Sequence, residues 1–207
     1  MILAVDTSLG TAVALTDGDG ADRAEASASD PLRHAEVIGD LLADVAAAAP
    51  GDRLTHVVAG MGPGPFTGLR IGIAAARAFA SGRRIPVIPV PSHFAAALTA
   101  IETDAVAGPF AIVTDARRRE FAVTVFDGLD GDRLPRVVAE TALVPRDDVD
   151  GRLDGIRRID VMALSALDLA RVGARALAAG RELAGDEPLY LRHPDVTVPG
   201  APKRVGT

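Results

Sequence analysis

The 207-residue sequence contains no cysteine, tryptophan, asparagine or glutamine. Without cysteine, the chain has no disulfide, no thiolate nucleophile and no cysteine-ligated iron–sulfur cluster. The single lysine, Lys203, lies in the C-terminal tail, so neither a P-loop lysine nor a buried Schiff-base lysine is available. These absences exclude several classes of enzyme chemistry before any motif is considered.

Long apolar runs are also missing. No run reaches the ~18 residues that a membrane-spanning helix needs, and Met1–Val5 leads into Asp6 without a basic leader. We therefore expect a cytoplasmic protein with no signal peptide and no membrane contact. The net charge of −6 and the dispersed arginines argue against a self-sufficient nucleic-acid binder, while 48% hydrophobic residues indicate a folded globular chain.

Residues 55–82 contain the most distinctive stretch, THVVAGMGPGPFTGLRIGIAAARAFASG. A short apolar run ends in the Gly60–Pro65 turn residues, and a helical period begins at about Phe66. In that helix Gly68, Gly72, Ala76 and Ala80 recur every fourth residue, so one face has almost no side chains. Another backbone must approach this seam closely, either within the chain's own core or across an interface with a partner.

The rest of the first half alternates between predicted strands and helices. We expect strands at 2–5, 11–16, 21–29 and 85–90, an alanine-rich helix at 92–102, and a helix that begins with Asp30 as N-cap and Pro31 in its first turn. An apolar stripe on that helix comprises Val37, Ile38, Leu41, Leu42 and Val45.

After a polar connector at 103–109 the pattern begins again. The strand ending in Asp115 repeats the strand ending in Asp6, and a second strand ends in Asp127-Gly128 as the earlier one ends in Asp17-Gly18. Further on we expect a strand at 134–144, a helix at 164–179 and a Pro-rich tail that orders only against a neighbour. Together these elements predict a duplicated actin-like (ribonuclease-H-like) α/β fold, with an N-terminal lobe at 1–103 and a C-terminal lobe at 104–207.

In such folds the two Asp hairpins face a nucleotide. The first hairpin has short side chains that suit oxyanions, but the second carries Arg117–Arg119, which would crowd the cleft and could instead contact RNA phosphate or remain a solvated surface. The alternative is that Asp6 and Asp115 only fix hairpin turns. The candidate nucleotide-facing residues are Asp6, Thr7, Ser8, Gly10, Thr11, Asp115 and Arg117.

The four histidines make no predicted metal cluster. One turn after His93 stands Ala97, and one turn after His34 stands Ile38, so neither helix offers a pair of ligands on one face. We expect each histidine to be a helix cap or a surface residue, and we expect no metal and no cofactor. No G-x-S-x-G motif is present either.

With these residues in view, the sequence resembles the bacterial tRNA threonylcarbamoyladenosine biosynthesis protein family TsaB (YeaZ). The resemblance covers 2–18, 30–126 and 188–192 and is carried by ILAVDTS, TDARRREFAV, PLYLR and, most specifically, GMGPGPFTGLRIGIAAARAFA. The family-motif residues in that last run include Gly62, Pro63, Gly64, Phe66, Thr67 and Arg70. The polar stretch 145–163 lacks the family's Gly-rich strand–turn, so the second lobe is expected to be trimmed by a strand.

The resemblance implies a non-catalytic subunit that pairs with the paralogous catalytic subunit TsaD and the ATPase TsaE. This complex makes N6-threonylcarbamoyladenosine in tRNAs reading ANN codons, and the subunit would meet tRNA only through it. The HxxxH metal pair of the catalytic paralog is absent from PSHFAAA here. The family's pairing helices map to about 32–49 and 66–82, which makes Val37, Leu41, Val45, Gly68, Gly72 and Ala76 the candidate interface residues.

Two other hypotheses stay open. A stand-alone enzyme, either an actin-like ATPase or a glycoprotease-like peptidase, would turn over substrate without a companion. A free homodimer would join two copies of the chain through the same helices.

Overall fold

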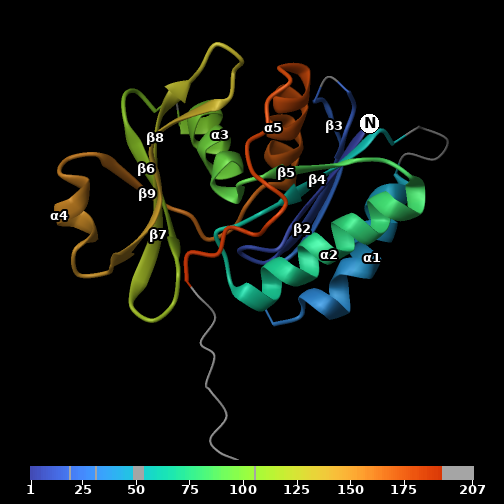
Figure 1. The fold of residues 1–207 in the computed structure, drawn as a ribbon, viewed down its shortest axis with the longest axis horizontal. Coiled ribbons are helices and arrows are strands. Elements are labelled where there is room, and N and C mark those ends of the chain that lie inside the picture. Colours follow the sequence, from blue (N-terminus) through green and yellow to red (C-terminus); the bar gives the residue numbers. More distant parts are fainter. Residues whose placement is uncertain (19, 31, 49–53, 105, 193–207) are drawn as a thin grey trace, which may run out of the picture.

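The computed structural model describes residues 1–18, 20–30, 32–48, 54–104 and 106–192. Two mixed sheets lie beside one another, with helices on their faces (Figure 1). The predicted Pro-rich tail lies outside the described residues. No helix in the described ranges is long and apolar enough to cross a bilayer.

The first sheet has five strands in the order β3-β2-β1-β4-β5. Strand β1 pairs antiparallel with β2 and parallel with β4, and it is buried on both faces, as its continuous apolar run predicts. The elements of this half are β1 (Ile2–Asp6), β2 (Thr11–Thr16), β3 (Asp22–Ala28), α1 (His34–Ala47), β4 (His56–Gly60), α2 (Phe66–Arg83), β5 (Val87–Val90) and α3 (Ser92–Asp104).

The second sheet repeats this order with one strand fewer, as β8-β7-β6-β9. The stretch 145–163, which showed no clear pattern in the sequence, forms a short helix and an edge strand parallel to β6. The elements here are β6 (Phe110–Asp115), β7 (Glu120–Leu129), β8 (Pro135–Pro145), α4 (Val149–Leu153), β9 (Arg157–Asp160) and α5 (Ala166–Ala178). The predicted fold class is therefore confirmed.

Four helices cover the first sheet, and one of them also contacts the second. Helices α1 and α2 cover one face of the first sheet, where Leu3 and Val5 meet Leu42 and Ile73. On its other face α3 and α5 pack against Ile2 and Ala4, and α3 also packs against the second sheet. Because α5 returns to the first sheet, an element from 104–207 completes the N-terminal core. The division at residue 103 stays a prediction.

Two local predictions are wrong. Helix α1 begins at His34 rather than at Asp30, because the Asp30 carboxylate accepts a hydrogen bond from the Leu32 N–H and fixes a turn before the helix. Strand β7 does not end at Asp127-Gly128. The ladder between β7 and β8 shifts register between Phe126 and Leu129, and the strand continues through that irregularity to Leu129.

Candidate functional site: the cleft between the two lobes

Asp6, at the end of β1, is 2% exposed, and its carboxylate accepts hydrogen bonds inside the N-terminal lobe. One oxygen, Oδ1, accepts hydrogen bonds from the Ser8 N–H at 2.8 Å and from the Ser8 hydroxyl. The other, Oδ2, accepts from the Ser92 hydroxyl at 2.5 Å, and the Ser92 oxygen in turn accepts from the Gly62 N–H. Charged acceptors of this kind make strong hydrogen bonds. Asp6 therefore joins three segments of the chain, and it is a structural residue.

Asp6→Asn is expected to lower the free energy of unfolding by about 1–3 kcal/mol, because its amide group faces donors that then lack an acceptor. Chemical denaturation measures this loss. Asp40→Asn, at an exposed position on α1, is the control and should change stability by less than about 0.5 kcal/mol. Equal stability of the two variants would contradict the structural role. If the role holds, loss of an activity in Asp6→Ala would not identify a metal ligand.

Thr7 and Thr11, in the same hairpin, are also directed into the protein. The Thr7 hydroxyl donates to the Gly68 carbonyl at 2.8 Å, and Thr11 Oγ1 lies 2.8 Å from His34 Nδ1. Burial lowers the pKa of His34, partly offset by the charges of Asp6 and Asp30. Four of the five predicted nucleotide-facing residues of this hairpin, Asp6, Thr7, Ser8 and Thr11, thus make internal bonds. The fifth, Gly10, lies in the turn with a φ of 128°.

The glycine seam of α2 is filled by this hairpin. A Cβ on Gly72 would lie 2.1 Å from Thr7 Oγ1, and one on Gly68 would lie 2.9 Å from both the Thr7 carbonyl oxygen and His34 Nε2. Ala76 and Val45 are buried as well. The prediction of these four residues as a partner interface is wrong, because the small side chains admit the chain's own hairpin and the core beneath α1.

The second hairpin repeats the aspartate turn with an unusual tip. Asp115 Oδ1 accepts from the Arg117 N–H at 2.8 Å, as Asp6 accepts from Ser8. Partial burial alone would raise the pKa of Asp115, but the Arg117 N–H and the Arg146 ion pair bring it below its ordinary value. Arg117, Arg118 and Arg119 have φ values of 62°, 51° and 62°. Three consecutive non-glycine residues in the left-handed region are strained. The turn-fixing interpretation of both aspartates is therefore supported.

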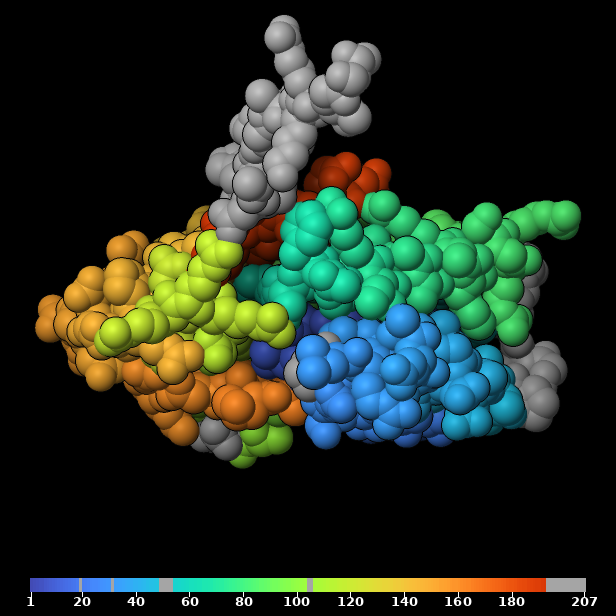
Figure 2. Space-filling view, turned by 90° about the horizontal axis from the view of Figure 1, so that it is seen from below, coloured from blue at the N-terminus to red at the C-terminus, as the bar shows by residue number. Residues whose placement is uncertain are grey.

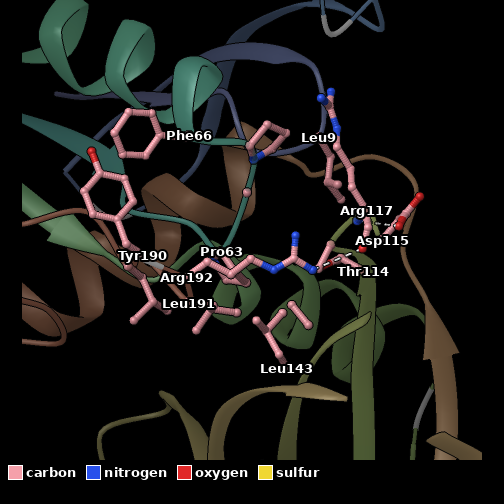
Figure 3. A pocket seen from close by; sticks show the side chains of 15 residues that line it. Leu9, Pro63, Phe66, Thr114, Asp115, Arg117, Leu143, Tyr190, Leu191 and Arg192 are labelled. Atoms are coloured by element: carbon pink, nitrogen blue, oxygen red, sulfur yellow. Dashed lines mark hydrogen bonds between the residues drawn. The ribbon is translucent and has the colours of Figure 1, made fainter. Parts of the chain in front are cut away.

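The two hairpins face one another across a small cavity of about 110 Å³. Leu9 of the first hairpin and Asp115 and Arg117 of the second line it together with the Gly64–Phe66 turn (Figure 3). The Arg192 guanidinium reaches into it and donates to the Arg117 carbonyl at 3.2 Å. A nucleotide needs a pocket of several hundred cubic ångströms, so the cavity between the hairpins is too small for one. A larger cavity of about 480 Å³ lies between the lobes beside His93 and Thr124, under residues 183–190.

Ser92 and His93, the first residues of α3, are functional candidates that sequence reasoning missed. Ser92 bonds Asp6 of the first lobe, while His93 Nδ1 lies 2.7 Å from Thr124 Oγ1 and His93 Nε2 lies 3.0 Å from Thr114 Oγ1 in the second. Adjacent residues therefore connect the two lobes. The only signal in the sequence was the polar pair opening an alanine-rich helix.

The prediction that the histidines are caps or surface residues is wrong for His93 and His34, which are 1% and 4% exposed. Desolvation lowers the pKa of His93 to about 3, so its ring is neutral. The fourth histidine, His193, lies outside the described residues. Within the described ranges no three His, Cys, Asp or Glu side chains are placed to hold a metal ion.

The outer faces of α1 and α2 form a continuous surface on one side of the molecule (Figure 2). Here Val37 and Leu41 are half-buried, unlike the seam residues. We define the outer helical face by the exposed Ala35, Gly39, Ala43, Ala74 and Ala78 with the half-buried Val37, Leu41, Ile71 and Phe79. The exposed Glu36, Asp40 and Asp44 lie on the same helix α1, so the face also carries negative charge. Of the predicted interface residues, Val37 and Leu41 are the ones that remain accessible.

The fold and the cleft define a two-lobed, duplicated actin-like protein whose two aspartate hairpins are held by internal bonds. The family model described as "TsaD: tRNA N6-adenosine threonylcarbamoyltransferase" matches residues 30–147, more than half of the chain. The chain belongs to this family, which places it among proteins of tRNA modification.

The chain is also similar to a mycobacterial protein and to solved structures. An uncharacterized protein of Mycobacterium tuberculosis is 35% identical over 151 residues, which are 69% of this chain and 66% of the relative. This chain therefore matches slightly less than two thirds of the relative's length. Two structures from Pseudomonas aeruginosa, one titled YeaZ and one with similarity to peptidase YEAZ, share the fold. Their TM-scores are 0.72 and 0.76, each at 24% identity over 92% of this chain and 99% of that one. The resemblance to TsaB (YeaZ) is confirmed at the level of family and fold.

Proposed function

We propose that this chain is a non-catalytic scaffold subunit of the bacterial complex that makes N6-threonylcarbamoyladenosine in tRNAs reading ANN codons. It binds and activates the paralogous catalytic subunit TsaD together with the ATPase TsaE. It acts in the cytoplasm and meets tRNA through the assembled complex. Membership of the tRNA-modification family supports the reaction, and the state of the cleft supports the division of labour.

The observation that carries the non-catalytic role is the engagement of the hairpin aspartate. Asp6, in the position where an actin-like ATPase would hold a metal, already accepts three hydrogen bonds from protein groups. His93, the second residue of the helix after β5, bonds threonines through both ring nitrogens, and Ala97 stands one turn later. Asp6 and His93, the side chains at the positions where catalysis would be expected, thus make hydrogen bonds that stabilise the two lobes.

The outer helical face is the docking surface for TsaD. It offers small and half-buried apolar side chains on two packed helices, where a partner helix can approach closely and exclude water. A second copy of the chain could bind the same face. The homodimer and the heterodimer would then compete for this surface and could not form at the same time. Excess TsaD should then convert any homodimer to the heterodimer.

The experiment is reconstitution of the modification reaction with and without this chain. Ala74→Arg, in the outer helical face, is expected to weaken TsaD binding at least tenfold and to lower modification in parallel, because it introduces a large charge into a close-packed contact. Ala178→Arg, at the exposed end of α5, is the matched control and should bind as the wild type does. Full modification without this chain would contradict the proposal.

The stand-alone enzyme makes the opposite prediction. An actin-like ATPase or a peptidase would turn over ATP or peptide as a purified chain, with TsaD and TsaE absent. Robust turnover of that kind would replace the scaffold proposal.

A further inference from the structure

The segment that follows α5 crosses both lobes. We call residues 180–192 the strap. Its hydrogen bonds to the N-terminal lobe include one from the Arg77 guanidinium to the Asp186 carbonyl and one from the Leu189 N–H to the Met61 carbonyl at 2.7 Å. The strap therefore follows the end of β4 and the side of α2.

Tyr190 fixes the strap to the first turns of α2. Its ring lies 4.8 Å from the ring of Phe66, and its hydroxyl accepts a hydrogen bond from Arg70 Nε at 2.9 Å. The Arg70 guanidinium also lies 3.7 Å above the Phe66 ring, where a cation is attracted to the aromatic face. Phe66 and Arg70, two of the family-motif residues, thus hold the strap.

Two residues further on, Arg192 has reached the other lobe. Its guanidinium pairs with the Glu120 carboxylate and donates to the Arg117 carbonyl of the second hairpin. Both charged side chains are about 30% exposed. The distance from lobe to lobe is covered by three residues, so separation of the lobes at this rim must break one attachment or the other.

The attachments at the cleft rim differ from those at its base. At the base, Ser92 and His93 connect the lobes through fully buried hydrogen bonds, which open only with the core. At the rim, Arg192 closes the span through the part-exposed ion pair with Glu120 and the hydrogen bond to the Arg117 carbonyl. Part-exposed pairs of this kind are weak and easily exchanged with water. This arrangement has a firm hinge on one side and a releasable contact on the other.

We propose that the strap is a latch that holds the cleft closed, with the Arg192–Glu120 pair as its releasable contact and the Arg70–Tyr190 pair as its attachment to α2. Because Arg70 lies on the exposed side of α2, beside the outer helical face, the latch couples the state of that helix to the opening of the cleft. A role for this coupling in binding TsaD rests on the proposed function. The latch itself is a property of the free chain.

The absence of native cysteine makes a distance measurement direct. Thr67→Cys on α2 and Asp148→Cys before α4 place two spin labels on exposed positions on either side of the cleft. Double electron–electron resonance on the free chain should give one narrow distribution of distances between the two labels. Arg192→Met, which keeps the side-chain stem, is expected to increase the population at longer distances about two- to fivefold.

The control and the rescue separate the latch from a general effect of removing an arginine. Arg136→Met breaks an ion pair with Asp127 inside the second lobe and should leave the distribution unchanged. Arg192→Glu and Glu120→Arg should each open the cleft, and the two together should close it again. A distribution in Arg192→Met identical to that of Arg136→Met would overturn the latch.

The coupling to α2 is tested by Arg70→Met, also in the free chain. This variant removes the Tyr190 hydroxyl's partner and the charge above Phe66, and it should open the cleft as Arg192→Met does. An unchanged distribution would show that α2 and the cleft are independent. Failure of TsaD to bind would refute the proposed function while leaving these distances, and the latch, intact.

Discussion

Gly72→Ala is expected to lower the free energy of unfolding by about 1–2 kcal/mol, although alanine is the better helix former. The added methyl group would lie 2.1 Å from Thr7 Oγ1 and 2.8 Å from Thr7 Cγ2. Overpacking of this kind costs typically about 1–3 kcal/mol, which exceeds the roughly 0.5–1 kcal/mol gained from helix propensity. Thr7 cannot turn away without losing its hydrogen bond to Gly68. Urea denaturation measures the change.

Gly39→Ala is the matched control. Gly39 lies on the exposed side of α1, and a Cβ there meets nothing within 4 Å. It should therefore stabilise the protein by about 0.5–1 kcal/mol. In the double variant Thr7→Ala/Gly72→Ala the two closest atoms, Thr7 Oγ1 and Cγ2, are gone and only the residue-7 Cβ stays close, at 2.9 Å. Most of the clash is relieved, so the two losses should not add. Additive losses, or a stabilised Gly72→Ala, would contradict the packing of the seam against the hairpin.

The glycine seam of α2 was predicted only in part from the sequence. The spacing of Gly68, Gly72 and Ala76 correctly required a close backbone approach, but the pattern does not identify the element that approaches. The element that approaches is the turn after β1, some 60 residues earlier in the chain. Only the folded arrangement distinguishes that turn from a partner helix. Val37 and Leu41, the two predicted interface residues on the surface of α1, lie outside the seam and stay a prediction.

The fold itself was predictable because local signals agreed. The buried character of β1, the Gly-Pro turn before α2 and the repeated Asp at the ends of β1 and β6 each indicated the same duplicated unit. The helix α4 and strand β9 were not visible, since a five-residue helix and a charged edge strand of four residues carry almost no periodicity. The position of α5 on the first sheet was equally hidden, because its amphipathic stripe fits either lobe.

The site was less accessible than the fold for a related reason. The type of a residue tells what its side chain can bond, but it does not tell which partner the fold supplies. Asp6 and Asp115 could have faced a nucleotide, but in the fold Asp6 bonds Ser8 and Ser92, and Asp115 pairs with Arg146. The pair Ser92-His93 carries no motif, yet it joins the two lobes. Its effect should be visible in the response to acid.

Acid is expected to destabilise the protein through His93. In the unfolded chain a histidine binds a proton near its ordinary pKa of 6.5, whereas in the folded protein burial lowers the pKa of His93 to about 3. Between these values the unfolded state holds more protons, so stability rises with pH and is lost as pH falls. One such proton corresponds to about 1.4 kcal/mol per pH unit.

The comparison that isolates His93 is the pH dependence of the unfolding free energy in wild type and in His93→Gln. Between pH 6 and pH 5 most carboxylates are ionised in both states, and a glutamine amide can still bond Thr114 or Thr124. The slope of the variant should be smaller by about 1 kcal/mol per pH unit. Burial also lowers the pKa of His34 and of His56, but both remain in the variant and cancel in the difference. Equal slopes would mean that the imidazole can take up a proton in place, and the two lobes would then be joined by a contact that yields to acid without unfolding.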